Sequence, residues 1–290
     1  MFNVKFILPR SPYQDLILSR HLLVDDHTKT LFCFAPKVGC TNLKLALFYA
    51  QGLIEKDDLI KPRDDIDQNK LEDCIILTSI LSRNKPEWIA IIKNNFKFIM
   101  HRNPLERLLS AYRSKISRYP LVGLKKDMPH YNWLRRRIFA YTHPLDYKGW
   151  ILHRGQAIVN ISFADFIDYW LTYDLSSDEH FRTIFSLCEP CHVHYHYYGN
   201  FKMFDKDARV FLNRIGGNAE LLRSGYYEDV SSTATNQLLN HYYEQLNLYQ
   251  KLAAIRKLSM ELDFYYNVFP TEMDSHKQIL GIDYDIPRPY

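Results

Sequence analysis

Residues 31–44 of the chain read LFCFAPKVGCTNLK. The apolar run at 31–35 has the length and composition of a buried strand, and a proline follows it. Gly39 permits a tight turn because it has no Cβ atom. Thr41 or Asn42 can then cap a helix whose apolar residues share one face. The segment therefore predicts a strand, a short loop and a helix, in that order.

This arrangement is suited to binding an anion. The first N–H groups of a helix lack backbone partners, and the helix dipole favours negative charge there. Lys37 lies in the loop and can add a positive charge, while Thr41 can add a hydroxyl donor. The nucleotide-binding pattern GxxxxGKS/T is absent from the chain, which disfavours an ATP or GTP hydrolase. On layout alone, an ordinary strand-to-helix turn with a surface lysine is the alternative.

A second stretch repeats this order of elements. Residues 95–100 read NFKFIM and predict another buried strand. Asn103 is a good cap, and Pro104 a good first residue, for the helix that follows. One apolar stripe runs along that helix, formed by Leu105, Leu108, Leu109, Tyr112 and Ile116.

Polar residues around this second helix can bind a phosphate group. Ligands of open α/β sheets bind beyond the carboxyl ends of the strands, where Arg102 lies. Its forked donors, together with the hydroxyl of Ser110, can hold a phosphate. The alternative is a solvated helix face, and that interpretation is preferred for Arg107, Arg113 and Lys115.

The rest of the chain predicts more helix than strand. Helices are expected at 74–81, 86–93, 162–173 and 202–215, with a longer one at 231–262 broken into two; a weak strand is expected at 191–198, and irregular structure at 1–29 and 118–157. No repeat and no Gly/Ser linker divides the sequence. We therefore expect one domain over residues 1–290, with 1–29 as a peripheral N-terminal segment and 267–290 as a C-terminal tail.

Composition limits the possible functions. Hydrophobic residues make up 47% of the 290 residues, which is enough for a large core, and the net charge of +4 is too small to indicate nucleic-acid binding. No run of 18 apolar residues occurs, and residues 1–8 are too short for a signal peptide. Asn160 begins the one glycosylation sequon in the chain. These observations indicate a folded α/β protein without a membrane-spanning segment of its own.

The five cysteines do not indicate a metal site. Cys188 and Cys191 form a CxxC motif, but a zinc site needs a second such pair, and the chain has none. A thioredoxin-like redox pair also lacks the expected strand and helix around it. A local disulfide between these two cysteines is one expectation, provided that the protein occupies an oxidising compartment.

The two phosphate-binding segments resemble the 5′-phosphosulfate and 3′-phosphate motifs of the Golgi carbohydrate sulfotransferases, the family that includes the chondroitin 4-O-sulfotransferases. Two later stretches resemble the same family: 178–199, which contains DEHF and LCEPC, and 260–266, which reads MELDFYY. The matches occur in the family's order and span roughly residues 31–266. Departures from the family pattern occur at Leu43, Asn103, Leu105, Phe181, Asn200 and Lys202, and they leave the acceptor open.

The resemblance implies a P-loop-like α/β fold with a central parallel sheet flanked by helices. It implies 3′-phosphoadenosine-5′-phosphosulfate (PAPS) as the sulfuryl donor, with no metal ion. The acceptor is expected to be a hydroxyl group of a carbohydrate, with an acidic glycosaminoglycan among the candidates. Family members act in the Golgi lumen behind an N-terminal membrane anchor, so a chain without one is expected to be a truncated or anchorless form.

The resemblance also implies roles for individual residues. It places the 5′-phosphosulfate on a run of six residues: Lys37, Val38, Gly39, Cys40, Thr41 and Asn42. It places the 3′-phosphate on Arg102 and Ser110. Lys37 is expected to stabilise the charge that grows on the bridging oxygen during transfer. Within this family pattern Cys40 is a small packing residue rather than a nucleophile.

Two further expectations concern the acceptor. His180 is the first candidate for the general base because it lies in a family-like segment, and His101 is the second because it adjoins Arg102. The basic run 135–137 could contact an acidic glycan or could form a solvated face. The alternatives to the enzyme are a catalytically inactive glycan-binding relative and a nucleotide-dependent phosphotransferase.

Overall fold

A computed structural model describes residues 11–61, 66–117, 129–144, 150–153, 156–159, 161–217, 221, 232–273 and 277. The chain divides into two compact units. The first unit comprises Met1–Arg102 and Arg182–Glu228, and the second comprises Asn103–Phe181 and Asp229–Tyr290. Each unit is described by itself below, and the single domain expected from the sequence stays a prediction.

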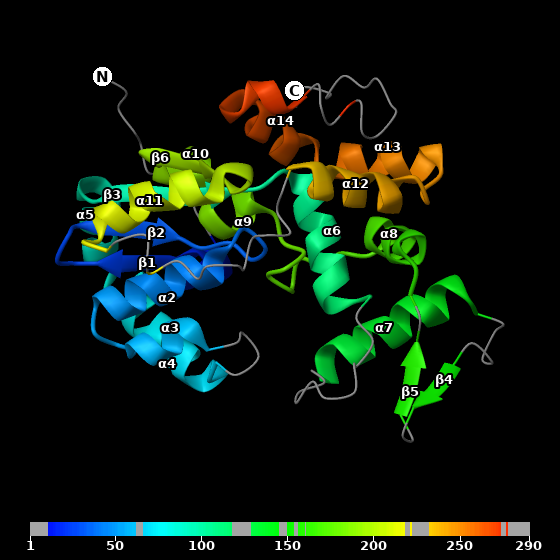
Figure 1. The fold of residues 1–290 in the computed structure, drawn as a ribbon, viewed down its shortest axis with the longest axis horizontal. Helices are drawn as coiled ribbons and strands as arrows, with labels where there is room; N and C mark the ends of the chain where they lie inside the picture. The colour runs from blue at the N-terminus through cyan, green and yellow to red at the C-terminus, as the bar shows by residue number, and fades with distance from the viewer. Residues whose placement is uncertain are drawn as a thin grey trace. The chain divides into compact units, whose positions relative to one another are not determined.

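The first unit is built on a four-stranded sheet of order β1-β2-β3-β6 (Figure 1). Its strands are β1 (Leu22–Asp25), β2 (Thr30–Cys33), β3 (Phe96–His101) and β6 (Tyr197–Asn200). β1 runs antiparallel to β2, whereas β2, β3 and β6 are mutually parallel. The expected α/β class with a central, mainly parallel sheet is confirmed.

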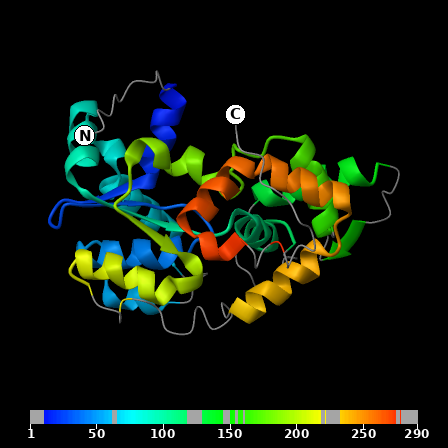
Figure 2. The same ribbon diagram turned by 90° about the horizontal axis from the view of Figure 1, so that it is seen from above.

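Helices cover both faces of this sheet (Figure 2). They are α1 (Pro12–His21), α2 (Cys40–Ala50), α3 (Lys56–Ile60), α4 (Gln68–Thr78), α5 (Lys85–Asn94), α9 (Ile184–Cys188), α10 (Pro190–Val193) and α11 (Phe204–Arg214), with 3-10 turns at Ile80–Ser82 and Phe201–Met203. Successive residues of a strand point to opposite faces. Accordingly, Phe32 packs on Phe211 of α11, with ring centroids 4.9 Å apart, while its neighbour Cys33 bonds to Cys188 of α9.

The second unit is mainly helical. It contains α6 (Pro104–Lys115), α7 (Pro129–Thr142), α8 (Phe163–Thr172), α12 (Ser232–Tyr243), α13 (Leu248–Lys257) and α14 (Ser259–Val268), a 3-10 turn at Pro270–Glu272, and an antiparallel hairpin of β4 (Trp150–His153) and β5 (Gln156–Val159). The apolar stripe of α6 enters an aromatic core. Tyr112 lies 5.0 Å from Phe163, which in turn lies 5.2 Å from Tyr243, measured between ring centroids. The stripe expected on this helix is confirmed.

Several predicted segments differ from the structure. Residues 1–29 were expected to be irregular, yet α1 and β1 form there, because Ser11 and Gln14 make a capping box and Pro12 starts the helix. Residues 118–157 were also expected to be irregular, yet they contain α7, β4 and the start of β5. The strand expected at 191–198 begins later, at Tyr197, and is β6. The short helix α10 precedes it in the sequence. The long helix at 231–262 is three helices rather than two.

Two observations concern the described part of the chain only. No helix in it is both long enough and apolar enough to cross a bilayer. Within the same residues, no group of three or more His, Cys, Asp or Glu side chains is arranged to hold a metal ion. Asn160, which begins the glycosylation sequon, and most of the expected tail at 267–290 lie outside the described residues.

Candidate functional site

The loop between β2 and α2 has an unusual backbone. Lys37 adopts φ 74° and Gly39 adopts φ 78°, both in the left-handed region. Glycine enters this region freely, but a residue with a Cβ atom pays roughly 1–3 kcal/mol in strain. Strained residues of this kind occur at ligand-binding sites, where the surrounding structure holds them in place. The loop therefore holds the backbone of Lys37 in a conformation that its side chain does not favour.

The first turn of α2 presents uncapped donors. Gly39 is its N-cap residue, so no side chain accepts a hydrogen bond from the first amides, and the first turn contains no acidic residue. Asn42 is 3% exposed, and its Nδ2 is buried without a protein hydrogen-bond partner. A buried amide donor usually has a partner, and leaving it without one costs free energy. The turn therefore has the donors, and lacks the acidic side chains, that binding an anion requires.

Arg102 joins this loop from the end of β3. Its Nη1 donates a hydrogen bond of 3.3 Å to the carbonyl oxygen of Lys37, and its guanidinium lies 4.6 Å from the ring centroid of Phe201. Because β2 and β3 are adjacent parallel strands, their carboxyl ends meet at one edge of the sheet. The structure thus brings Lys37 and Arg102 together, as the two motifs predicted. The ring of Phe201, which carries no sequence signal of its own, completes the contact.

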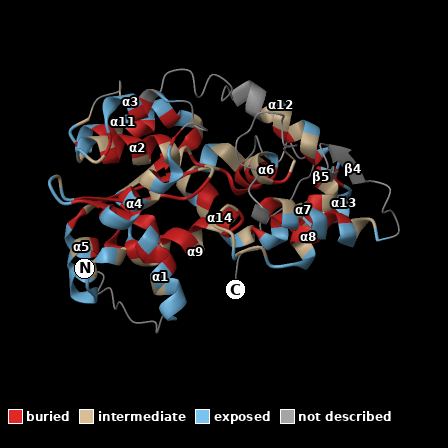
Figure 3. Cartoon of the chain, turned by 90° about the horizontal axis from the view of Figure 1, so that it is seen from below, coloured by how far each residue is buried: buried red, intermediate tan, exposed pale blue. Residues whose placement is uncertain are grey.

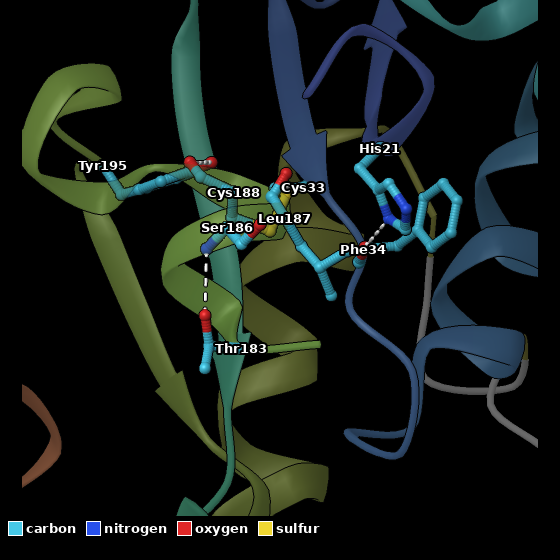
Figure 4. The surroundings of a disulfide bond; sticks show 8 residues. All are labelled: His21, Cys33, Phe34, Thr183, Ser186, Leu187, Cys188 and Tyr195. Atoms are coloured by element: carbon cyan, nitrogen blue, oxygen red, sulfur yellow. Dashed lines mark hydrogen bonds between the residues drawn. A yellow bond between two sulfur atoms is a disulfide. The ribbon is translucent and has the colours of Figure 1, made fainter. Parts of the chain in front are cut away.

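A disulfide anchors the strand that leads into this loop (Figure 4). Cys33, the last residue of β2, is bonded to Cys188 at the end of α9, 155 positions away in the sequence. The hydroxyl of Tyr195 donates to the carbonyl oxygen of Cys188 at 2.7 Å, and Thr183 caps α9. The expected pairing of Cys188 with Cys191 is wrong, because Cys188 faces the sheet while Cys191 is exposed and free.

The remaining predicted site residues belong to the second unit. Ser110 is half-buried on α6, and its role in binding the 3′-phosphate stays a prediction. Arg107 was expected on a solvated face but is only 4% exposed. It donates to the carbonyl oxygen of Glu179 at 3.3 Å and lies 4.0 Å from the carboxylate of Glu261. This helix face is therefore buried around Arg107.

His180 lies in a polar cluster with Asp178 and Tyr131. Its Nδ1 is 2.8 Å from Oδ1 of Asp178 and 3.2 Å from the hydroxyl of Tyr131. The ammonium group of Lys115 lies 4.8 Å from the centroid of the Tyr131 ring. From the sequence, His180 was proposed as a base without its hydrogen-bond partner. The carboxylate of Asp178, two positions earlier, is the sequence feature that could have indicated this partner.

The pKa shifts of His180 and Asp178 both favour a neutral imidazole ring at His180. Burial lowers the pKa of His180 below its ordinary value, although the hydrogen bond to Asp178 acts in the opposite direction. Burial alone would raise the pKa of Asp178, but the hydrogen bond and the attraction to His180 outweigh it and lower that pKa to about 2. At neutral pH the ionised carboxylate of Asp178 therefore accepts a hydrogen bond from the N–H at Nδ1, which leaves Nε2 as the basic nitrogen.

Two other predicted candidates fit their roles less well. His101 is 1% exposed within β3, and its ring lies 5.9 Å from that of Tyr198. A base needs access to the acceptor hydroxyl, so His180 is the better candidate. Arg135 uses Nε and Nη1 to bind the carbonyl oxygen of Ile116 and the side chain of Asn132, at 2.7 and 2.9 Å. Arg135 therefore holds protein groups rather than projecting into solvent.

Comparison of the sequence with known proteins agrees with the anion-binding geometry of the Lys37 loop. Residues 20–267 match the model of the sulfotransferase family, and the chain therefore belongs to that family. The resemblance seen in the sequence is confirmed at the level of the carbohydrate sulfotransferases by the following relatives.

The chain is 27% identical to rat (Rattus norvegicus) carbohydrate sulfotransferase 11 over 232 residues, which cover 79% of this chain and 61% of the relative. It is 30% identical to human (Homo sapiens) carbohydrate sulfotransferase 14 over 216 residues, which cover 72% and 51%. It is 26% identical to mouse (Mus musculus) carbohydrate sulfotransferase 8 over 258 residues, which cover 84% and 54%. The matched region is thus about half to six-tenths of the length of these relatives. No solved structure matches the chain.

Proposed function

We propose that the protein transfers the sulfuryl group of PAPS to a hydroxyl group of a carbohydrate. The observation that carries this proposal is the edge of the sheet where Lys37, the uncapped first turn of α2 and Arg102 meet. Membership of the sulfotransferase family and relatives named as carbohydrate sulfotransferases support the same reaction. They also disfavour a nucleotide-dependent phosphotransferase.

The residues of the loop fit a phosphosulfate group. Bound PAPS supplies an activated sulfuryl group whose leaving group is adenosine 3′,5′-bisphosphate. The amides of residues 38–41 and the buried Nδ2 of Asn42 offer donors without a competing carboxylate in the first turn. Arg102 offers a guanidinium for the 3′-phosphate. For Ser110, the same role rests on the family motif and stays a prediction.

Lys37 and His180 supply the two chemical functions. As the bond from sulfur to the bridging oxygen breaks, negative charge grows on that oxygen, and the ammonium group of Lys37 stabilises it. The acceptor oxygen forms its new bond to sulfur and loses a proton to Nε2 of His180. Asp178 keeps the proton of Nδ1 in place, so that Nε2 stays the accepting nitrogen. The role of Asp178 is to position His180.

The disulfide supports a location in the secretory pathway. Disulfides persist in oxidising compartments, and Cys33–Cys188 links two buried segments of the first unit. The Golgi lumen belongs to this pathway. We place the protein there on this ground together with its family.

A binding experiment followed by a transfer assay tests the proposal. Adenosine 3′,5′-bisphosphate should raise the melting temperature of the protein, because a ligand that binds only the folded state stabilises it. ATP with magnesium should not. Transfer of labelled sulfate from PAPS should then be screened over neutral and acidic glycans. Stabilisation by the bisphosphate without transfer to any acceptor would favour the inactive glycan-binding relative instead, and stabilisation by ATP with magnesium alone would overturn the proposal.

A further inference from the structure

Lys115 brings a positive charge to the His180 cluster. It lies in the last turn of α6, and its side chain is half-buried, although a solvated helix face was expected there. Arg113, two positions earlier on the same helix, is exposed as expected. α6 thus carries buried residues as well as more exposed ones (Figure 3). The two basic residues at the end of this helix therefore lie in different surroundings.

An aromatic ring holds the ammonium group of Lys115 beside this cluster. Its Nζ lies 4.8 Å from the centroid of the Tyr131 ring, a distance at which the ring face attracts a cation. The hydroxyl of the same ring lies 3.2 Å from Nδ1 of His180, and the two rings meet edge to face with their centroids 6.2 Å apart. Burial raises the pKa of Tyr131, so its hydroxyl stays protonated and adds no negative charge. Tyr131 therefore links the end of α6 to the candidate base.

The negative groups around His180 favour its protonated form. The carboxylate of Asp178 lies 2.8 Å from Nδ1, and Glu179 directly precedes His180 in the chain. Burial has the largest influence on the pKa of His180 and lowers it; the hydrogen bond to Asp178 and the charge of Glu179 raise it, and the positive charge of Lys115 lowers it. Lys115 thus acts in the same direction as burial and opposes the two carboxylates.

We propose that Lys115 is a positioning residue that keeps the ring of His180 neutral, so that Nε2 can accept the proton of the acceptor hydroxyl. The proposal rests on the proposed function, since it concerns the base of that reaction. An imidazolium ion has no lone pair at Nε2 and cannot act as a base. Arg107, also on α6, lies 4.0 Å from the carboxylate of Glu261, whose charge offsets its own. The structure therefore assigns this role to Lys115 rather than to Arg107.

Nuclear magnetic resonance tests the effect of Lys115 on His180 without any turnover. In the whole chain with carbon-13-labelled histidine, the Cε1–H signal of His180 is the one that disappears in His180→Asn. In Lys115→Gln, the titration midpoint of this signal should move to higher pH, because a positive charge that opposes protonation has been removed. Lys115→Arg should keep the wild-type midpoint, since it retains the charge.

Arg113→Gln is the matched control. A cation in the last turn of a helix also interacts favourably with the helix dipole, and Arg113 and Lys115 share that structural role. Arg113 is exposed, so its removal should leave the midpoint of His180 at the wild-type value. An unchanged midpoint in Lys115→Gln, or an equal shift in Arg113→Gln, would overturn the proposal.

The pH dependence of sulfuryl transfer gives a second readout. In Lys115→Gln the acidic limb of kcat should move to higher pH, and kcat on that limb should fall about threefold, the order of magnitude expected for the loss of one nearby charge. Lys115→Arg should follow the wild-type profile. A shifted midpoint without transfer to any acceptor would refute the proposed function and leave the effect of Lys115 on His180 intact. A shifted midpoint with an unshifted rate profile would show that His180 is not the base and would overturn the role of Lys115 in the reaction.

Discussion

The loop around Lys37 and the cluster around His180 are both polar sites, yet they are built in opposite ways. The loop presents backbone donors without side-chain caps and a lysine in a strained conformation. The cluster consists of side chains that hold one another, with Asp178 and Tyr131 both beside Nδ1 of His180. An open set of donors suits a ligand that brings its own charge, whereas a closed network suits a group whose protonation must be controlled.

The largest expected effect comes from removing the positive charge of Lys37 from the loop. Lys37→Ala should lower kcat by roughly 10²- to 10³-fold, the loss typical of one group that stabilises developing charge. The melting temperature should change little, because the amine is not part of the core. Steady-state rates with PAPS and circular dichroism measure the two effects. Near-normal turnover in this variant would refute the role assigned to Lys37.

The His180 cluster should respond through pH. His180→Ala should lower kcat by about 10²-fold, the lower range for general bases. In the wild type the rate should rise with pH through the pKa of His180, which lies below the ordinary value because the ring is buried. Asp178→Asn removes a group that raises this pKa, so the acidic limb of the profile should move to still lower pH and the maximal rate should fall.

Tyr131→Phe is the matched control for the cluster. It removes the hydroxyl 3.2 Å from Nδ1 but leaves the carboxylate of Asp178 in place. The acidic limb should therefore move less than in Asp178→Asn. An acidic limb that stays unchanged in both variants, at full activity, would show that His180 is not the base.

The smallest expected effect concerns backbone strain at Lys37. Lys37→Gly should be as inactive as Lys37→Ala, because both lack the amine. It should nevertheless be more stable than Lys37→Ala by about 1 kcal/mol, since glycine adopts a positive φ without a steric cost. Urea unfolding of the two variants measures the difference. Equal stability would mean that the loop relaxes when the lysine is removed.

Local signals made the strand-loop-helix segments predictable. Asn103 caps α6 through its Oδ1, and Pro104 follows it at the first helical position, as the sequence indicated. The parallel order of β2 and β3 then places Lys37 and Arg102 at one edge. Both inferences rest on short-range chemistry and on a general rule for α/β sheets.

Long-range pairings were not predictable in the same way. Cys33 and Cys188 are brought together only by the packing of α9 on the sheet, whereas the nearby Cys191 looked like the natural partner. Helix α7 was not predicted because its many tyrosines and arginines obscure the apolar periodicity of a helix. Its buried positions are nevertheless spaced by three and four, at Tyr131, Leu134 and Ile138. In each case tertiary contacts decided the outcome.

The bond between Cys33 and Cys188 has a consequence for anyone who produces this protein. It closes a covalent loop that contains just over half of the chain, and such a cross-link typically contributes about 2–4 kcal/mol to folding. Bacterial cytosol keeps thiols reduced, so material made there would lack the link beside the Lys37 loop. Expression in a secretory host, or refolding with a glutathione couple, is the appropriate preparation for every assay described above.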